Sequence, residues 1–211
     1  MSSKIQLDGV YIIDLLRASE RSFFRVEAFD SYNAPSEVGL LKKYYDGDPL
    51  PPPWDGSDEW FKLMSLFASK RRPTQRVRVI SRRLAPYVRF EMDWGYNHFL
   101  QFGEEFNVII REQFPDLNDT WDAEYFVIDD RRVVYIKYDE THRMLGLEEE
   151  LDAEEVKRRV NHKYQLLEKS THYGQFLSQL RKNGVVELPY LAPNIAGSLP
   201  HTRNVNNHGT K

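Results

Sequence analysis

Two segments with alternating side chains constrain the fold most strongly. Residues 22–29 read SFFRVEAF and residues 75–81 read QRVRVIS. Side chains of a β-strand point alternately to its two faces, so each segment is predicted to form a strand with one apolar face. The opposite face is charged, carrying Arg25 in the first strand and both Arg76 and Arg78 in the second. A sheet therefore supplies part of the core.

Helical and extended segments mix along the rest of the chain. Further strands are predicted at residues 106–111, 124–129 and 132–138, and helices at residues 8–18, 36–46, 58–69, 82–94 and 152–182. The last two strands flank Asp129, Asp130 and Arg131, which predicts a hairpin although the turn has no glycine. This mixture favours an α/β or α+β fold with a central mixed sheet and helices packed on it.

The chain is expected to fall into three regions. An α/β domain spans residues 1–150, a C-terminal helical extension spans 151–188, and a disordered tail spans 189–211. The tail contains no acidic residue and ends in NVNNHGTK, which gives it too few apolar groups to offset the entropy of ordering. The long helix of the extension, which Gly174 is placed to divide, either packs on the domain or pairs with a protein partner or a second copy.

Composition and missing motifs exclude several classes. The chain has 211 residues and no cysteine, which removes disulfides, thiolate nucleophiles and cysteine-based metal sites. No run of 18 apolar residues occurs and the first residues do not resemble a signal peptide, so we expect a cytoplasmic protein without a membrane partner. The motifs of nucleophile-elbow hydrolases, P-loop enzymes, dinucleotide binders and zincins are absent, and we expect no cofactor.

Histidine spacing gives no metal site. His162 and His172 lie ten residues apart in the long predicted helix, too far to share one ion. Both are predicted to be surface residues.

A resemblance covers about the first three quarters of the chain. The blocks SFFRVEAFDSYN, QRVRVISRRLAPYVRFEM and EYFVIDDRRVVYIKYD occur in this order between residues 15 and 139. Together they resemble the uncharacterised DUF6879 family, which is known mainly from actinobacteria. The family name implies no particular reaction.

A more distant resemblance concerns one half of the phospholipase D superfamily. There, His-x-Lys-x₄-Asp accompanies an apolar strand similar to YFVIDDRRVVYI. Asp122, Glu124 and Asp129 stand at the three motif positions here. The reaction needs a histidine nucleophile and a lysine that neutralises phosphoryl oxygens, so two acids in their place would repel the substrate. The resemblance implies a degenerate half domain, a pseudoenzyme.

The charge distribution points to a binding surface. Residues 60–90 contain nine basic and no acidic residues, which leaves the remainder of the chain at −12. Arginine suits bidentate contact with phosphate, and an adjacent aromatic ring can stack on a base. The predicted ligand-binding residues are Arg76, Arg78, Arg82, Arg89 and Tyr87. The alternative is a self-paired network in which these arginines neutralise the protein's own carboxylates.

These observations favour a non-catalytic binding or regulatory domain. Its ligand would be phosphate-bearing, a nucleic acid or nucleotide, or else an acidic protein partner. One alternative is a metal- and carboxylate-dependent phosphodiesterase or nucleotidyl hydrolase, with ligands among Glu91, Asp93, Asp122, Glu124, Asp129 and Asp130. The other is a scaffold that acts through its C-terminal helix.

Overall fold

The computed structural model describes residues 4–48, 58–121 and 123–183. Its sheet contains strands in the order β1-β7-β6-β5-β2-β3-β4-β8. The strands are β1 (Lys4–Gln6), β2 (Phe23–Glu27), β3 (Thr74–Ile80), β4 (Glu105–Ile110), β5 (Tyr125–Ile128), β6 (Arg132–Tyr138), β7 (Met144–Glu150) and β8 (Thr171–His172). The helices are α1 (Ile12–Ala18), η1 (Pro35–Glu37), α2 (Val38–Tyr45), α3 (Glu59–Ser69), α4 (Pro86–Phe90), η2 (Glu91–Gly95), α5 (Tyr96–Gln101), η3 (Arg111–Gln113), η4 (Pro115–Thr120), α6 (Ala153–Lys169) and α7 (Tyr173–Asn183).

The sheet is mixed, which confirms the predicted fold class. β2, β3 and β4 run parallel, whereas β5 pairs antiparallel with β2 and continues into an antiparallel meander of β6 and β7. The β5–β6 hairpin is also confirmed. Asp129 and Asp130 adopt φ values of 55° and 57°, the left-handed conformation that a tight two-residue hairpin turn requires. Aspartate tolerates this conformation better than most residues, so the turn forms without glycine.

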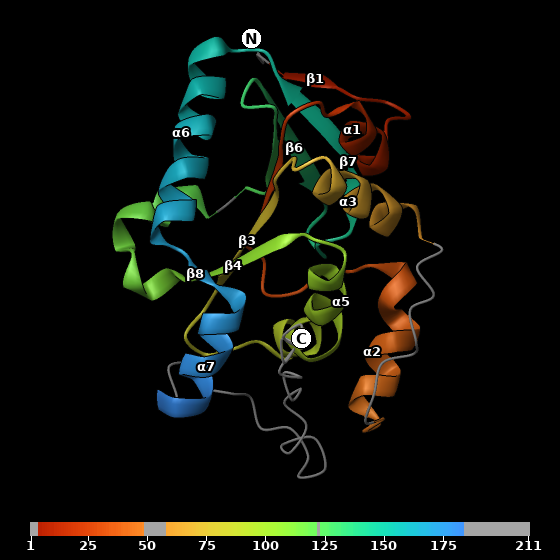
Figure 1. Ribbon diagram of the computed structural model, residues 1–211, viewed down its shortest axis with the longest axis vertical. Helices are drawn as coiled ribbons and strands as arrows, with labels where there is room; N and C mark the ends of the chain where they lie inside the picture. The colour runs from red at the N-terminus through yellow and green to blue at the C-terminus, as the bar shows by residue number, and fades with distance from the viewer. Residues whose placement is uncertain (1–3, 49–57, 122, 184–211) are drawn as a thin grey trace, which may run out of the picture.

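One face of the sheet is covered by α6 (Figure 1). Leu166 of α6 packs with alternate apolar residues of β2, β3, β5 and β6, among them Val77 and Val127. His162 faces the same layer, where its Nδ1 lies 2.6 Å from the hydroxyl of Tyr125. Its placement on the surface was therefore a wrong prediction, because the apolar side of α6 includes this residue; His172 is exposed as expected.

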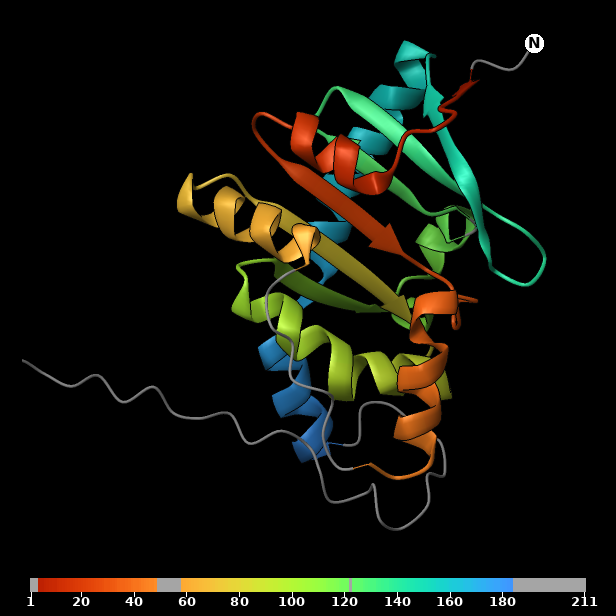
Figure 2. The ribbon, with the colours of Figure 1, turned by 90° about the vertical axis from the view of Figure 1, so that its right-hand side faces the viewer.

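The opposite face is covered by two separate groups of helices (Figure 2). α1 and α3 pack over the β5–β6–β7 side, with Leu16 and Met64 in the core. The helical segment from α4 to α5 packs with α7 over the β4 side, where Phe106 and Phe176 are buried. Between these two apolar clusters the middle strands β2 and β3 carry charged side chains.

Several elements differ from their predicted extent. The segment predicted as one helix over residues 152–182 forms α6 and α7, separated by β8, and Gly174 is the second residue of α7 rather than the point of division. The helix predicted over residues 82–94 begins at Pro86 and continues to Gln101 through the π-helical turn η2. β1, β7 and β8 were not predicted. The tail at residues 189–211 lies outside the described residues, and no described helix has the length and apolar character needed to cross a membrane.

Candidate ligand-binding site

Four charged residues form the floor of the candidate site. In the parallel pair of β2 and β3, Arg25 is the register partner of Arg76, and Glu27 is the partner of Arg78. All four alternate with apolar residues and therefore share the sheet face that lies between the two groups of helices. The sequence alternation thus places a square of three arginines and one glutamate at the centre of the sheet.

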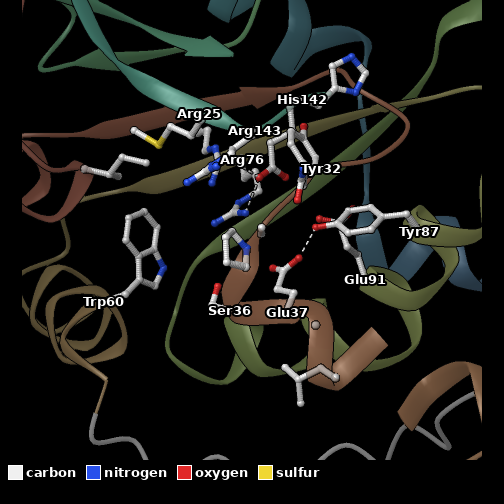
Figure 3. Close-up of a pocket in the computed structure, with 18 of the residues that line it drawn as sticks. Arg25, Tyr32, Ser36, Glu37, Trp60, Arg76, Tyr87, Glu91, His142 and Arg143 are labelled. Atoms are coloured by element: carbon white, nitrogen blue, oxygen red, sulfur yellow. Dashed lines mark hydrogen bonds and ion pairs between the residues drawn. The ribbon is translucent and has the colours of Figure 1, made fainter. Parts of the chain in front are cut away.

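A pocket of about 1010 Å³ opens above this floor. Its walls come from α1 and α3 on one side, the segment around η1, the α4–η2–α5 segment, and the β6–β7 hairpin. In Figure 3 the guanidinium groups of Arg25 and Arg76 point away from the sheet into the space between Trp60 on one side and Tyr87 on the other. His142 and Arg143 stand on the hairpin side.

The floor is a network of ion pairs. Oε1 of Glu27 accepts from Arg25 Nη2 at 3.0 Å and from Arg76 Nη1 at 2.8 Å. Arg76 also donates to both oxygens of Glu104, at 2.8 and 3.2 Å. Arg78 donates to Glu91 at 2.8 Å. Three arginines thus pair with three carboxylates of the protein itself. Much of this floor is therefore the self-paired network predicted from the sequence as the alternative to a binding surface.

Two carboxylates of the pocket, Glu27 and Glu91, have very different proton affinities. Burial alone would raise the pKa of Glu27, but Arg25, Arg76 and Arg78 lower it to about 2. Burial dominates at Glu91 and raises its pKa to about 7, although Arg78 acts in the opposite direction. Glu27 is therefore ionised at neutral pH, whereas Glu91 changes its charge there.

Three buried polar atoms of the lining have no hydrogen-bond partner among the residues that the structure describes. They are Arg25 Nε, Glu27 Oε2 and Trp60 Nε1. Glu27 is only 2% exposed, and the side chain of Arg25 is 17% exposed. Buried polar groups are nearly always satisfied in folded proteins, so such atoms in one pocket are the groups that a ligand would satisfy.

Tyrosines form much of the polar wall, and Glu124 positions two of them. Tyr138 donates to Glu124 at 2.8 Å, and Tyr32 donates to the other oxygen of the same carboxylate. The backbone N–H of Ala28 also donates to Glu124 at 2.8 Å. Glu124 therefore joins the end of β2 to the pocket wall through hydrogen bonds.

The structure separates the residues of the predicted basic site. Arg76 and Tyr87 line the pocket, and Arg78 lies fully buried in its floor. Arg82 is exposed, and Arg89 pairs with Asp93 at 2.7 Å; neither lines the pocket in the described part of the chain. The expected convergence of four guanidinium groups is therefore wrong. Arg82 precedes the helix that begins at Pro86, and Arg89 lies on a face of that helix where it pairs with Asp93.

Of the three phospholipase D-like positions, the two that the structure describes lie apart. Asp122 lies outside the described residues, while Glu124 and Asp129 stand before and after β5, roughly 16 Å apart at the usual rise per residue. Asp129 accepts from the backbone N–H groups of residues 20, 21 and 22. These bonds lower the pKa of Asp129 against the effect of its burial.

The expected carboxylate cluster is likewise dispersed. Glu91 is bound to Arg78, Asp93 to Arg89, and Asp130 to Lys163 at 2.7 Å. Among the described residues, no group of three or more histidine, aspartate or glutamate side chains is arranged to hold a metal ion. Glu91, Asp93 and Asp130 are thus each paired with a cation of the protein itself.

Arg25, Glu27 and Trp60 were missed as site residues. The basic segment begins at residue 60, so Arg25 did not belong to it. The available signal was the charged face of residues 22–29, because two charges on one side of a buried strand need partners on the neighbouring strand. Trp60 was predicted only as an apolar residue of its helix.

A protein-family model matches most of the helices and strands described above. A family model described as a domain of unknown function, DUF6879, matches residues 12–178. The chain belongs to the DUF6879 family. The matched region of this DUF6879 protein includes the whole pocket floor, α6 and part of α7. Among curated proteins, none matches the chain.

Two solved structures are similar to this DUF6879 protein. One is a phospholipase D family member, Nuc from Salmonella typhimurium, with 9% identity and a TM-score of 0.45 over 76% of this chain and 87% of Nuc. The other is TrmBL2, an archaeal chromatin protein described with a novel mode of DNA binding. It has 10% identity and a TM-score of 0.37, over 76% of this chain and 49% of its own.

Proposed function

We propose that this DUF6879 domain is a binding domain for a small phosphate-bearing molecule of nucleotide size, held in the pocket above β2 and β3. The observation that carries the proposal is the pocket itself, which is lined by Arg25, Glu27 and Trp60, each with a buried polar atom that has no partner among the described residues. Its volume of about 1010 Å³ suits an organic molecule rather than a bare ion.

Burial favours a small ligand over a macromolecule. The side chains of Arg76 and Arg78 are at most 4% exposed, so a nucleic-acid duplex or an acidic protein surface has no access to them. Proteins contact the phosphates of nucleic acids mostly through exposed cationic side chains. A molecule that enters the pocket can contact Arg76, which lines it, without unfolding the domain.

The pocket offers an anion one exposed arginine at its rim and a floor that becomes more positive when Glu91 is protonated. Arg143 is exposed at the rim on the β6–β7 hairpin and lines the pocket. Arg78 keeps its charge at any accessible pH, whereas the pKa of Glu91 is raised to about 7 by burial. Uptake of one proton by Glu91 thus offsets part of the charge of a phosphate.

Aromatic side chains on opposite sides of the pocket suit a planar group. Figure 3 shows Trp60 on one side and Tyr87 with Tyr32 on the other. Bases stack on such rings with about 1–3 kcal/mol for each base. Tyr87 is held in place by the hydrogen bond that its hydroxyl donates to Glu37. A base between these walls leaves its phosphate near the rim.

Calorimetric titration with AMP and adenosine tests this function. We expect wild-type protein to bind AMP, and Arg143→Gln to weaken AMP binding about tenfold while leaving adenosine binding unchanged. A tenfold change corresponds to about 1.4 kcal/mol. Arg82→Gln removes an equally exposed arginine outside the pocket and should bind AMP like wild type. Absence of AMP binding at millimolar ligand, or equal loss in both variants, would contradict the proposed function.

A further inference from the structure

Two unpartnered atoms of the pocket lining belong to the same ion pair, that of Glu27 and Arg25. Glu27 Oε1 is occupied by Arg25 and Arg76, which leaves Oε2 as a buried acceptor. Arg25 uses Nη2 in this ion pair and leaves its Nε–H as a buried donor. The free acceptor and the free donor therefore belong to two groups that are joined at 3.0 Å in one ion pair.

The chemistry of each atom fixes what it can meet. The carboxylate of Glu27 stays ionised at neutral pH and accepts hydrogen bonds only. A ligand carbonyl oxygen next to Oε2 would be repelled, because both atoms carry lone pairs. A ligand N–H would instead donate a hydrogen bond to Oε2. The guanidinium of Arg25 donates only, so its Nε–H needs a ring nitrogen or an oxygen. The complementary ligand edge therefore carries a donor and an acceptor side by side.

Amino-bearing bases have this edge. Adenine presents its exocyclic amino group beside ring N1, and cytosine presents its amino group beside ring N3. Hypoxanthine and uracil present the reverse order, an oxo group beside a ring N–H. A carboxylate that accepts from an exocyclic amino group is a common mode of base recognition.

Resting on the proposed function, we propose that Glu27 and Arg25 read the base of the bound nucleotide and select one with an exocyclic amino group, adenine or cytosine. Glu27 Oε2 accepts from the amino group, and Arg25 Nε donates to the adjacent ring nitrogen. Trp60 lies on the wall beside them, where its ring can cover the face of the base.

Two pairs of ligands test this selectivity on the wild-type protein. AMP is compared with IMP, and CMP with UMP, by calorimetric titration. The two members of each pair share ribose and phosphate. They differ in the base edge, which has an amino group beside a ring nitrogen in AMP and CMP and an oxo group beside a ring N–H in IMP and UMP. We expect the amino-bearing member of each pair to bind at least tenfold more tightly, because the oxo member leaves Glu27 and Arg25 without partners. Equal affinities within both pairs would overturn the inference.

A variant pair assigns the preference to Glu27. In Glu27→Gln the side-chain amide donates as well as accepts, so the preference for AMP over IMP should fall to less than threefold. Glu105→Gln changes an exposed carboxylate that does not line the pocket and accepts from Gln75, and it should keep the full preference. If Glu27→Gln keeps the full preference, the assignment is wrong.

The outcomes separate the two proposals. If AMP and IMP bind equally and Arg143→Gln weakens both, the domain binds nucleotides without reading the base, and only the selectivity fails. If no nucleotide binds, the proposed function fails. Since the ligand pairs are compared on wild-type protein, the result does not depend on the stability of Glu27→Gln.

Discussion

Arg78 and Glu91 form an ion pair in the floor of the pocket, with Nη2 of the arginine 2.8 Å from Oε2 of the glutamate and the arginine side chain fully buried. The pair joins β3 to the π-helical turn η2, the segment that forms one pocket wall. Turns of this π-helical type are frequent at functional sites.

Breaking this pair should destabilise the fold. Arg78→Met leaves the Glu91 carboxylate buried without its cation and also removes the hydrogen bond to Tyr32. Loss of one partner of a buried ion pair costs about 3–5 kcal/mol. We expect a decrease of that size in the free energy of unfolding from urea denaturation. Arg82→Gln, an exposed change, should stay within about 0.5 kcal/mol; a comparably small effect for Arg78→Met would contradict the pairing.

AMP binding should depend on pH through Glu91. An anion in the pocket favours the protonated carboxyl, and the pKa of Glu91 lies at about 7 before the ligand binds. Affinity should therefore increase as the pH falls from 8.5 to 6.5. Glu91→Gln has no proton to gain and should show a flatter profile in the same buffers. Titration of the phosphate itself is common to both proteins, so identical profiles would exclude Glu91 as the proton acceptor.

His162 should make the fold sensitive to acid. Burial, with Arg159 and Arg158 adding to it, lowers the pKa of His162 from 6.5 to about 4. Between these pH values the unfolded chain binds the extra proton, so the free energy of unfolding decreases as the pH falls from 6.5 to 4. The full effect is roughly 3 kcal/mol. His162→Gln should lose this part of the pH dependence in denaturation curves, and an unchanged slope would contradict it.

Asp129 should matter for stability and not for binding. Its carboxylate accepts three backbone N–H bonds in the segment before β2, far from the pocket lining. Asp129→Ala leaves these donors unpaired and should lower the free energy of unfolding by about 1–3 kcal/mol. AMP affinity of the folded variant should equal that of wild type. A selective loss of binding would instead assign Asp129 to a site.

Alternation revealed the central strands but not β7, which lies between β1 and β6. Residues 144–150 read MLGLEEE, where consecutive acids give no strand pattern. In the sheet two of these acids pair with cations of β6, Glu149 with Arg132 at 2.7 Å and Glu148 with Lys137 at 3.5 Å. Cross-strand charge pairs stabilise such a strand, and they become visible only once the register is known.

The site was predictable only in part for a similar reason. Arg76 and Arg78 followed from the alternation of one strand, yet their partners Glu27, Glu104 and Glu91 come from three other segments. Sequence spacing does not specify which strand lies beside which. The pocket depends on the pairing of β2 with β3 and on helices that leave the middle of the sheet uncovered.

The Nε–H resonance of Arg25 tests the account most directly. Its cross-peak in a ¹H–¹⁵N correlation spectrum is assigned by its loss in Arg25→Gln and followed while AMP is added. We predict a shift that saturates with the calorimetric binding curve, because the ring nitrogen accepts this proton, whereas the exposed Arg131 does not shift. An unshifted Arg25 signal at saturating AMP would show that the nucleotide binds elsewhere, and it would contradict the pocket as the binding site.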